Sequence, residues 1–191
     1  MSHDFFFGYG SLVNRGTHGF EGAQTARLTG WKRMWRKTAR REAAFLTVVP
    51  DPGCEIDGLL AAVPGGDWAA LDLREAAYAR LDAAHQIALP DAMQASPPRI
   101  AVYSIPPTDH FAPDPDSPVL LSYLDVVIQG YLKEFGEAGV TRFFETTDGW
   151  DAPVLDDRTK PIYPRHMLLS VIEREMVDDL ISTKGVRLMR G

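Results

Sequence analysis

The sequence predicts a fold that combines β-strands with α-helices, the strands lying mainly in the first part of the chain and the longer helices in the last part. Short aromatic or β-branched runs, bounded by turn residues, recur up to residue 63. Apolar residues with helical spacing recur after residue 118. With 191 residues, 45% of them hydrophobic, the chain can bury a sizeable core, so we expect one domain.

The first element is a buried strand at residues 5–7 (FFF), which ends in a tight loop of sequence GYGSL at residues 8–12. Gly8 and Gly10 can adopt positive φ and leave room for a ligand close to the backbone. Successive N–H groups of such a loop can hold a carboxylate or a phosphate. The alternative is an ordinary turn after a strand.

The next part of the chain predicts a surface loop and several strands. Residues 14–24 are polar and contain glycine, as surface loops do. Residues 27–37 alternate large apolar and basic side chains, which indicates a strand or an irregular ribbon. The runs at 45–49 and 56–63 are separated by PDPG, which predicts two adjacent strands joined by a turn.

A short helix is predicted next, with Asp67 as its N-cap and Arg74 near its end. The pattern from Glu75 to Leu89 is ambiguous, because its alanines favour a longer helix while the part from Tyr78 onward suits a strand equally well. Pro90 ends either element. A further short apolar run covers residues 100–105.

The last part of the chain predicts helices separated by irregular segments. Five prolines make residues 106–118 a loop. An amphipathic helix is predicted at 119–135, a second helix at about 140–144 and a third at about 171–183. The apolar stripe of the third helix consists of Ile172, Met176, Leu180 and Ile181. Residues 146–165 form a long segment rich in proline, polar and aromatic residues, and ordered segments of this kind often serve function.

Composition excludes several classes of protein. The net charge of −6 argues against a general nucleic-acid binder. No apolar run approaches the ~20 residues needed to span a bilayer, and the N-terminus has no signal-peptide pattern, so we expect no membrane association and a cytoplasmic location. The single cysteine, Cys54, excludes an internal disulfide and agrees with a reducing compartment. Residues 27–41 nevertheless contain seven Lys or Arg and no acidic residue. This basic stretch is either a solvated strand face or an electropositive rim that attracts an anionic substrate.

The common catalytic and cofactor motifs are absent from the sequence. There is no GxxxxGK[ST] loop, no GxGxxG after a strand and no GxSxG around Ser11. The histidines have no HExxH or paired spacing, so we expect no metal site; they are His3, His18, His85, His110 and His166. Cys54 lies in a predicted turn and is expected to be a spectator thiol.

Residues 7–12 (FGYGSL) resemble the signature of the γ-glutamylcyclotransferase superfamily, especially its ChaC-like, glutathione-degrading branch. The resemblance continues in chain order through residues 5–130 and weakens after Gly139. The further segments that carry it are RLTGWKR at 27–33, LTVVP at 46–50, DGL at 57–59, LDLRE at 71–75 with Tyr78, and SYL at 122–124 through Gly130.

For structure, the resemblance implies an α+β fold with a mixed, partly closed β-barrel flanked by helices. It also implies that the helix stops before Glu75 and that Tyr78 onward is a strand. Residues 1–191 are then a single γ-glutamylcyclotransferase-like domain, with residues 140–191 as a C-terminal extension packed on it.

For activity, the resemblance implies that the α-amine of a small γ-glutamyl peptide or amine attacks its own γ-carbonyl. The products are 5-oxoproline and the released amine, and the reaction needs no cofactor, metal or protein nucleophile. The substrate is a small molecule, and the sequence leaves the oligomeric state open.

The resemblance also implies roles for particular residues. The backbone around Tyr9, Gly10, Ser11 and Leu12 would hold the substrate carboxylate and the oxyanion. Glu75 would shuttle the proton as general base and acid, although Arg74–Glu75 at a helix end is otherwise an ordinary solvated charge pair. The tyrosines expected to exclude water from the site are Tyr9, Tyr78 and Tyr123.

The chain departs from the ChaC pattern in two places. Ala76 and Ala77 stand where glycine is usual between the glutamate and the tyrosine, so glutathione cannot be assumed as the substrate. Residues 146–165 have no counterpart there; this segment either covers the site, with Trp150, Tyr163 or Arg165 touching the leaving group, or is a structural clamp. A non-catalytic protein that binds an amino acid or an anion in the same pocket is the alternative function.

Overall fold

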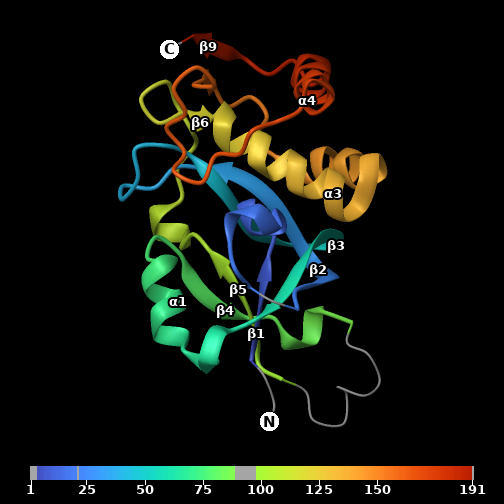
Figure 1. The fold of residues 1–191 in the computed structure, drawn as a ribbon. Coiled ribbons are helices and arrows are strands. Elements are labelled where there is room, and N and C mark those ends of the chain that lie inside the picture. Colours follow the sequence, from blue (N-terminus) through green and yellow to red (C-terminus); the bar gives the residue numbers. More distant parts are fainter. Residues whose placement is uncertain (1–3, 21, 89–97, 191) are drawn as a thin grey trace.

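The structure is a computed structural model that describes residues 4–20, 22–88 and 98–190. In this part of the chain, the strands form two sheets, and helices pack beside them (Figure 1). The larger sheet has the strand order β4-β5-β1-β3-β2-β7 and the smaller one the order β6-β8-β9. The strands of the larger sheet are β1 (Phe5–Gly8), β2 (Gln24–Arg36), β3 (Phe45–Ala62), β4 (Ala79–Asp82), β5 (Ile100–Ser104) and β7 (Thr147–Asp148). Those of the smaller sheet are β6 (Val119–Leu120), β8 (Val154–Asp156) and β9 (Leu188–Arg190).

The larger sheet is mixed, as the predicted α+β fold requires. β1 lies within it, antiparallel to β3 and parallel to β5. β4 and β7 form its two edges, and the described residues contain no pairing between these edges. The sheet is therefore open in the described residues, and the partly closed barrel is not confirmed.

The prediction of two adjacent strands at 45–49 and 56–63 is wrong. Both runs belong to the single strand β3, and both pair with β2 rather than with each other. The register shifts between Thr29, opposite Glu55, and Trp31, opposite Pro50. Gly30, at φ +80°, is thus the only β2 residue facing the four-residue excursion at 51–54, so the PDPG sequence produces a bulge instead of a hairpin.

The short helix is confirmed as α1 (Trp68–Arg74). Asp67 is its N-cap, and the Asp67 carboxylate accepts a hydrogen bond from the amide of Ala70. The helix ends before Glu75, which is the C-cap, and β4 begins at Ala79. The strand is shorter than expected, because a 3₁₀ turn, η4 (Ala84–Gln86), follows it; Leu89 and Pro90 lie outside the described residues.

Two of the predicted helices are one long element, α3 (Leu121–Glu145), bent at Gly136 with φ 65° and ψ −171°. The expected amphipathic pattern is not found, because every residue from Leu121 to Tyr131 is buried, the polar ones included. The residues that follow α3, called the C-terminal segment from here on, cover the face of α3 that would otherwise meet solvent. Arg158 of that segment, for example, pairs with the buried Asp125 at 2.7 Å.

The last helix is confirmed as α4 (Val171–Thr183), with a capping box between Ser170 and Glu173. Its predicted stripe is only partly correct. Ile181 is buried, but Ile172 is 73% exposed, and the buried partner of Ile181 is Val177. The 3.6-residue period therefore placed the helix correctly but only part of the face that packs.

The remaining 3₁₀ turns connect these elements: η1 (Ser11–Val13), η2 (Arg15–Thr17), η3 (Pro64–Gly66) and η5 (Pro107–Asp109). None of the helices in the described residues is both long and apolar enough to cross a bilayer.

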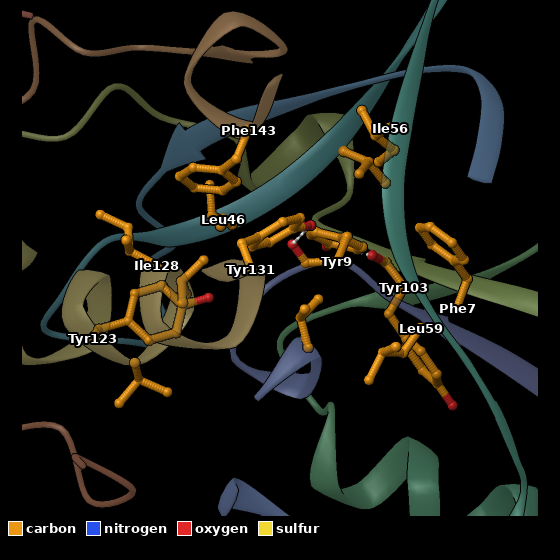
Figure 2. Packing of buried hydrophobic residues seen from close by; sticks show 14 of the residues in the cluster. Phe7, Tyr9, Leu46, Ile56, Leu59, Tyr103, Tyr123, Ile128, Tyr131 and Phe143 are labelled. Carbon is orange, nitrogen blue, oxygen red and sulfur yellow. Dashed lines mark hydrogen bonds between the residues drawn. The ribbon is translucent and has the colours of Figure 1, made fainter. Parts of the chain in front are cut away.

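The core joins the larger sheet to α3. In Figure 2, Tyr9 of the loop after β1 lies beside Tyr131 of α3, and Phe7 of β1 belongs to the same buried cluster. Tyr103 of β5 packs in the same cluster, and its hydroxyl donates to Asp72 of α1 at 2.6 Å. The end of β1, the start of α3 and the end of α1 therefore meet at one place in the molecule.

Candidate functional site

A cavity of about 200 Å³ lies at this meeting point. All seven side chains and backbone positions predicted for the site line it: Tyr9, Gly10, Ser11, Leu12, Glu75, Tyr78 and Tyr123. Its other lining residues are Phe6, Phe7, Gly8, Arg41, Phe45, Leu46, Arg74, Tyr103, Tyr163, Pro164 and Arg165. Residues far apart in the chain are thus brought to one ligand-sized hollow, and their chemical roles remain predictions.

The loop at residues 8–12 is held from its buried side. The carbonyl oxygen of Tyr9 accepts hydrogen bonds from Arg33 Nε at 3.3 Å and from the Tyr131 hydroxyl at 2.9 Å. Neither donor lines the cavity. In a trans peptide the C=O and the following N–H point in opposite directions, so the amide of Gly10 points away from Arg33.

The amides of Gly10 and Leu12 are the candidate ligand donors of this loop. Gly10 is the N-cap of η1, and the first N–H groups of a helix have no partner within it. The amides of Gly10 and Leu12 donate no backbone hydrogen bond within the described residues. Donors of this kind can hold a carboxylate or a developing oxyanion.

Gly10 is needed because Tyr123 of α3 approaches it closely. A Cβ atom at residue 10 would lie 2.7 Å from the Tyr123 hydroxyl oxygen. Tyr123 is buried, and its ring packs edge-on against Phe45 at 4.9 Å, so it has little room to move. The glycine therefore serves a close approach of side chain to backbone.

Glu75 lies at the end of α1, with its side chain 17% exposed. Its Oε1 is 3.4 Å from Arg74 Nε, and both residues line the cavity. The carboxylate thus belongs to the same hollow as the amides of Gly10 and Leu12. This is the arrangement that a proton shuttle acting on a loop-bound ligand requires.

The predicted wall is made of neutral tyrosines. Burial raises the pKa of the Tyr9, Tyr78 and Tyr123 phenols, and the negative charge of Glu75 raises the first two further. The Tyr9 hydroxyl donates to the carbonyl of Tyr103 at 2.6 Å and the Tyr78 hydroxyl to that of Leu46 at 3.0 Å. These two phenols are therefore engaged with the backbone, consistent with a wall.

The C-terminal segment also contributes to the cavity. Tyr163 is buried, and its hydroxyl donates to the Ser11 side chain at 2.9 Å. Tyr163 and Arg165 line the cavity, whereas Trp150 stacks on Phe144 at 4.5 Å and is absent from the lining. Proline and aromatic content marked this segment in the sequence, but nothing local distinguished Tyr163 from Trp150.

The basic stretch at residues 27–41 has several uses. Arg27 pairs with Asp57 and Lys32 with Asp148, so neither forms a free positive rim. Arg33 is buried beneath the loop. Arg41 lines the cavity and stacks over Phe45 at 4.8 Å.

No three His, Cys, Asp or Glu side chains gather into a metal-ligand group within residues 4–20, 22–88 and 98–190.

No family model matches this sequence, and no curated protein matches it. Solved structures do. A human protein described as uncharacterized has a TM-score of 0.58 and 14% identity, over 93% of this chain and 99% of its own. A structure described as a gamma-glutamyl cyclotransferase has a TM-score of 0.55 and 14% identity, over 92% of this chain and 98% of its own. YkqA from Bacillus subtilis has a TM-score of 0.52 and 16% identity, over 76% of this chain and 54% of its own. The chain therefore has a γ-glutamylcyclotransferase-like fold, as the sequence resemblance implied.

Proposed function

We propose that this protein converts a small γ-glutamyl compound into 5-oxoproline and a free amine. The observation that carries the proposal is that Glu75 and the loop of Gly10 and Leu12 line one cavity of about 200 Å³. The likeness in fold to a gamma-glutamyl cyclotransferase supports the same reaction class.

The reaction is intramolecular and needs no further reactant. Glu75 removes a proton from the α-ammonium group, and the freed amine attacks the γ-carbonyl carbon to form the ring C–N bond. The amides of Gly10 and Leu12 bind the negative charge of the substrate, including that which develops on the carbonyl oxygen. Glu75 then returns the proton to the departing nitrogen as the original amide bond breaks, and the ring nitrogen loses its second proton to solvent.

The protein contributes mainly by holding the substrate folded on itself. Well-oriented intramolecular reactions reach effective molarities of ~10⁵–10⁸ M. The tyrosine wall limits water, which would otherwise compete with the α-amine and yield glutamate. Tyr163 extends that wall from the C-terminal segment through its contact with Ser11.

The domain organisation belongs to the same proposal. We treat residues 140–191 as an extension of one domain, supported by the pairing of β7 with β2 and by the contact of Tyr163 with Ser11.

The test is incubation of the purified protein with a panel of γ-glutamyl amino acids, peptides and amines, with 5-oxoproline followed by mass spectrometry. Formation of 5-oxoproline together with equal amounts of free amine is the expected result. Binding of these compounds without any turnover would instead favour the non-catalytic binding protein. Glutamate as the main product would show hydrolysis and contradict the proposal.

A further inference from the structure

Arg74 has shielded polar atoms that make no hydrogen bond within the described residues. These are its Nη2, and its Nε, which has only the ion pair with Glu75 Oε1 at 3.4 Å. Its guanidinium lies over the Phe20 ring, 5.2 Å from the centroid, which stabilises the charge but accepts no hydrogen bond. Shielded polar groups of this kind are costly unless they find a partner, so a ligand atom is the natural acceptor.

Arg165 adds a second positive charge to the same cavity. It lines the cavity from the C-terminal segment, beside Tyr163, and is exposed to solvent. Burial lowers the pKa of Arg74, and the positive charge of Arg165 lowers it further, so the two guanidinium groups lie within electrostatic reach of each other. Two like charges therefore line one cavity, together with the carboxylate of Glu75.

The cavity as a whole is positively charged. Its described lining contains three arginines, Arg41, Arg74 and Arg165, against the single carboxylate of Glu75. In the proposed reaction the loop amides bind one anionic group of the γ-glutamyl part. The excess positive charge is then available to a second anion on the ligand.

We infer that Arg74 and Arg165 form an anion subsite for a carboxylate carried by the amine that is released. The substrate is then a γ-glutamyl amino acid or peptide, rather than a γ-glutamyl derivative of an uncharged amine. This inference rests on the proposed function for its chemistry. Guanidinium groups suit the role because their N–H donors match the two oxygens of a carboxylate.

The experiment compares γ-glutamyl-L-alanine with γ-glutamyl-ethylamide, which lacks only the carboxylate of the leaving amine. We expect the wild-type protein to favour the acid by roughly 10- to 100-fold in kcat/KM, the range for a hydrogen bond to a charged group. Arg74→Gln and, separately, Arg165→Gln should reduce this ratio towards one. The Arg165→Gln variant changes an exposed side chain, so it keeps the test usable if Arg74→Gln fails to fold. Arg187→Gln, an exposed arginine outside the cavity, is the matched control and should keep the wild-type ratio.

Calorimetric binding of the same two compounds separates this inference from the proposed function. Tighter binding of the acid, lost in Arg74→Gln, would support the subsite even if no 5-oxoproline forms. Turnover of both compounds with equal kcat/KM would overturn the subsite and leave the reaction standing. An equal loss for both compounds in Arg74→Gln would also overturn it, because Arg74 would then bind the γ-glutamyl part.

Discussion

Arg33 Nε donates a hydrogen bond of 3.3 Å to the carbonyl oxygen of Tyr9, from the side of the loop that faces the core. The remaining guanidinium donors meet Thr146 Oγ1 at 2.7 Å, the Asp57 carbonyl at 2.5 Å and the Tyr131 hydroxyl at 2.6 Å. All of these acceptors are neutral, and the Arg33 side chain is only 1% exposed. A buried positive charge without a carboxylate partner in the described structure thus lies on the core side of the loop that lines the cavity (Figure 2 shows Tyr9 and Tyr131).

Replacement of Arg33 by methionine should both destabilise the protein and weaken anion binding. The change removes a donor from the carbonyl oxygens of Tyr9 and Asp57, and the single hydroxyl proton of Tyr131 can bond to only one of them at a time. Each buried oxygen left without a donor lowers the free energy of unfolding by about 1–3 kcal/mol. Urea unfolding measures the loss, and calorimetric titration with a γ-glutamyl amino acid measures the affinity. Arg36→Met is the control, because among the described residues its guanidinium bonds only to the carbonyl of Trp35 next to it. Wild-type stability in Arg33→Met would show that the network is not needed.

Glu75→Gln should lower the rate of 5-oxoproline formation by roughly 10²–10⁴, the usual contribution of a positioned acid–base group. The amide keeps the shape of the side chain, so substrate should still bind. Glu42→Gln, an exposed glutamate away from the cavity, is the control and should retain full turnover. Near-normal turnover in Glu75→Gln would remove Glu75 from the mechanism.

Gly10→Ala should disrupt the site by a steric contact that a second change relieves. The new methyl group would lie 2.7 Å from the Tyr123 hydroxyl oxygen but 3.9 Å from the ring carbon that carries it. Removing the oxygen in Gly10→Ala/Tyr123→Phe should therefore recover much of the stability and activity that the single change loses. Thermal unfolding and the 5-oxoproline assay on all four combinations give the coupling. Equal losses in the single and double variants would show that the contact is not the cause.

His18 should make stability depend on pH. Burial, and then the positive charges of Arg74 and Arg15, lower the pKa of His18 from 6.5, while its contact with the Leu12 carbonyl and the charge of Glu134 oppose this. Nδ1 accepts from the Phe20 amide at 3.2 Å, so Nε2 must carry the proton donated to Leu12 at 2.9 Å. The folded state thus favours neutral His18, and this contribution is present above about pH 6.5 and is lost as the pH falls below it.

The measurement is urea unfolding at pH 7.5 and at pH 5.5, with the His18 ring followed by NMR. His18→Gln should reduce the difference in unfolding free energy between the two pH values, because the titrating group is gone. His85→Gln changes an exposed histidine and should leave the difference as it is. A His18 ring that titrates above pH 6.5 would contradict the prediction.

Local sequence determined the elements whose signals lie within a few residues of one another. Asp67 as N-cap follows from a side chain acting on its own backbone, and the loop after the aromatic strand follows from its glycines. The same holds for α4, whose capping box joins Ser170 to Glu173. The end of α1 before Glu75 was implied by the family resemblance, because the alanines after Glu75 suited a longer helix equally well. The family resemblance then predicted which of these residues share a site.

Tertiary structure alone decided everything that depends on contacts between distant parts of the chain. β3 is one strand because β2 offers partners to both of its halves, which PDPG could not reveal. Residues 121–131 of α3 are all buried because other segments cover that part of the helix, whereas Ile172 of α4 remains exposed. Arg33 reaches Tyr9 across 24 positions and Tyr163 reaches Ser11 across 152, and no periodicity encodes such pairs. The burial and the charge partners of a side chain depend on the segments that pack against it. Those segments are distant in the sequence, so only the folded structure identifies them.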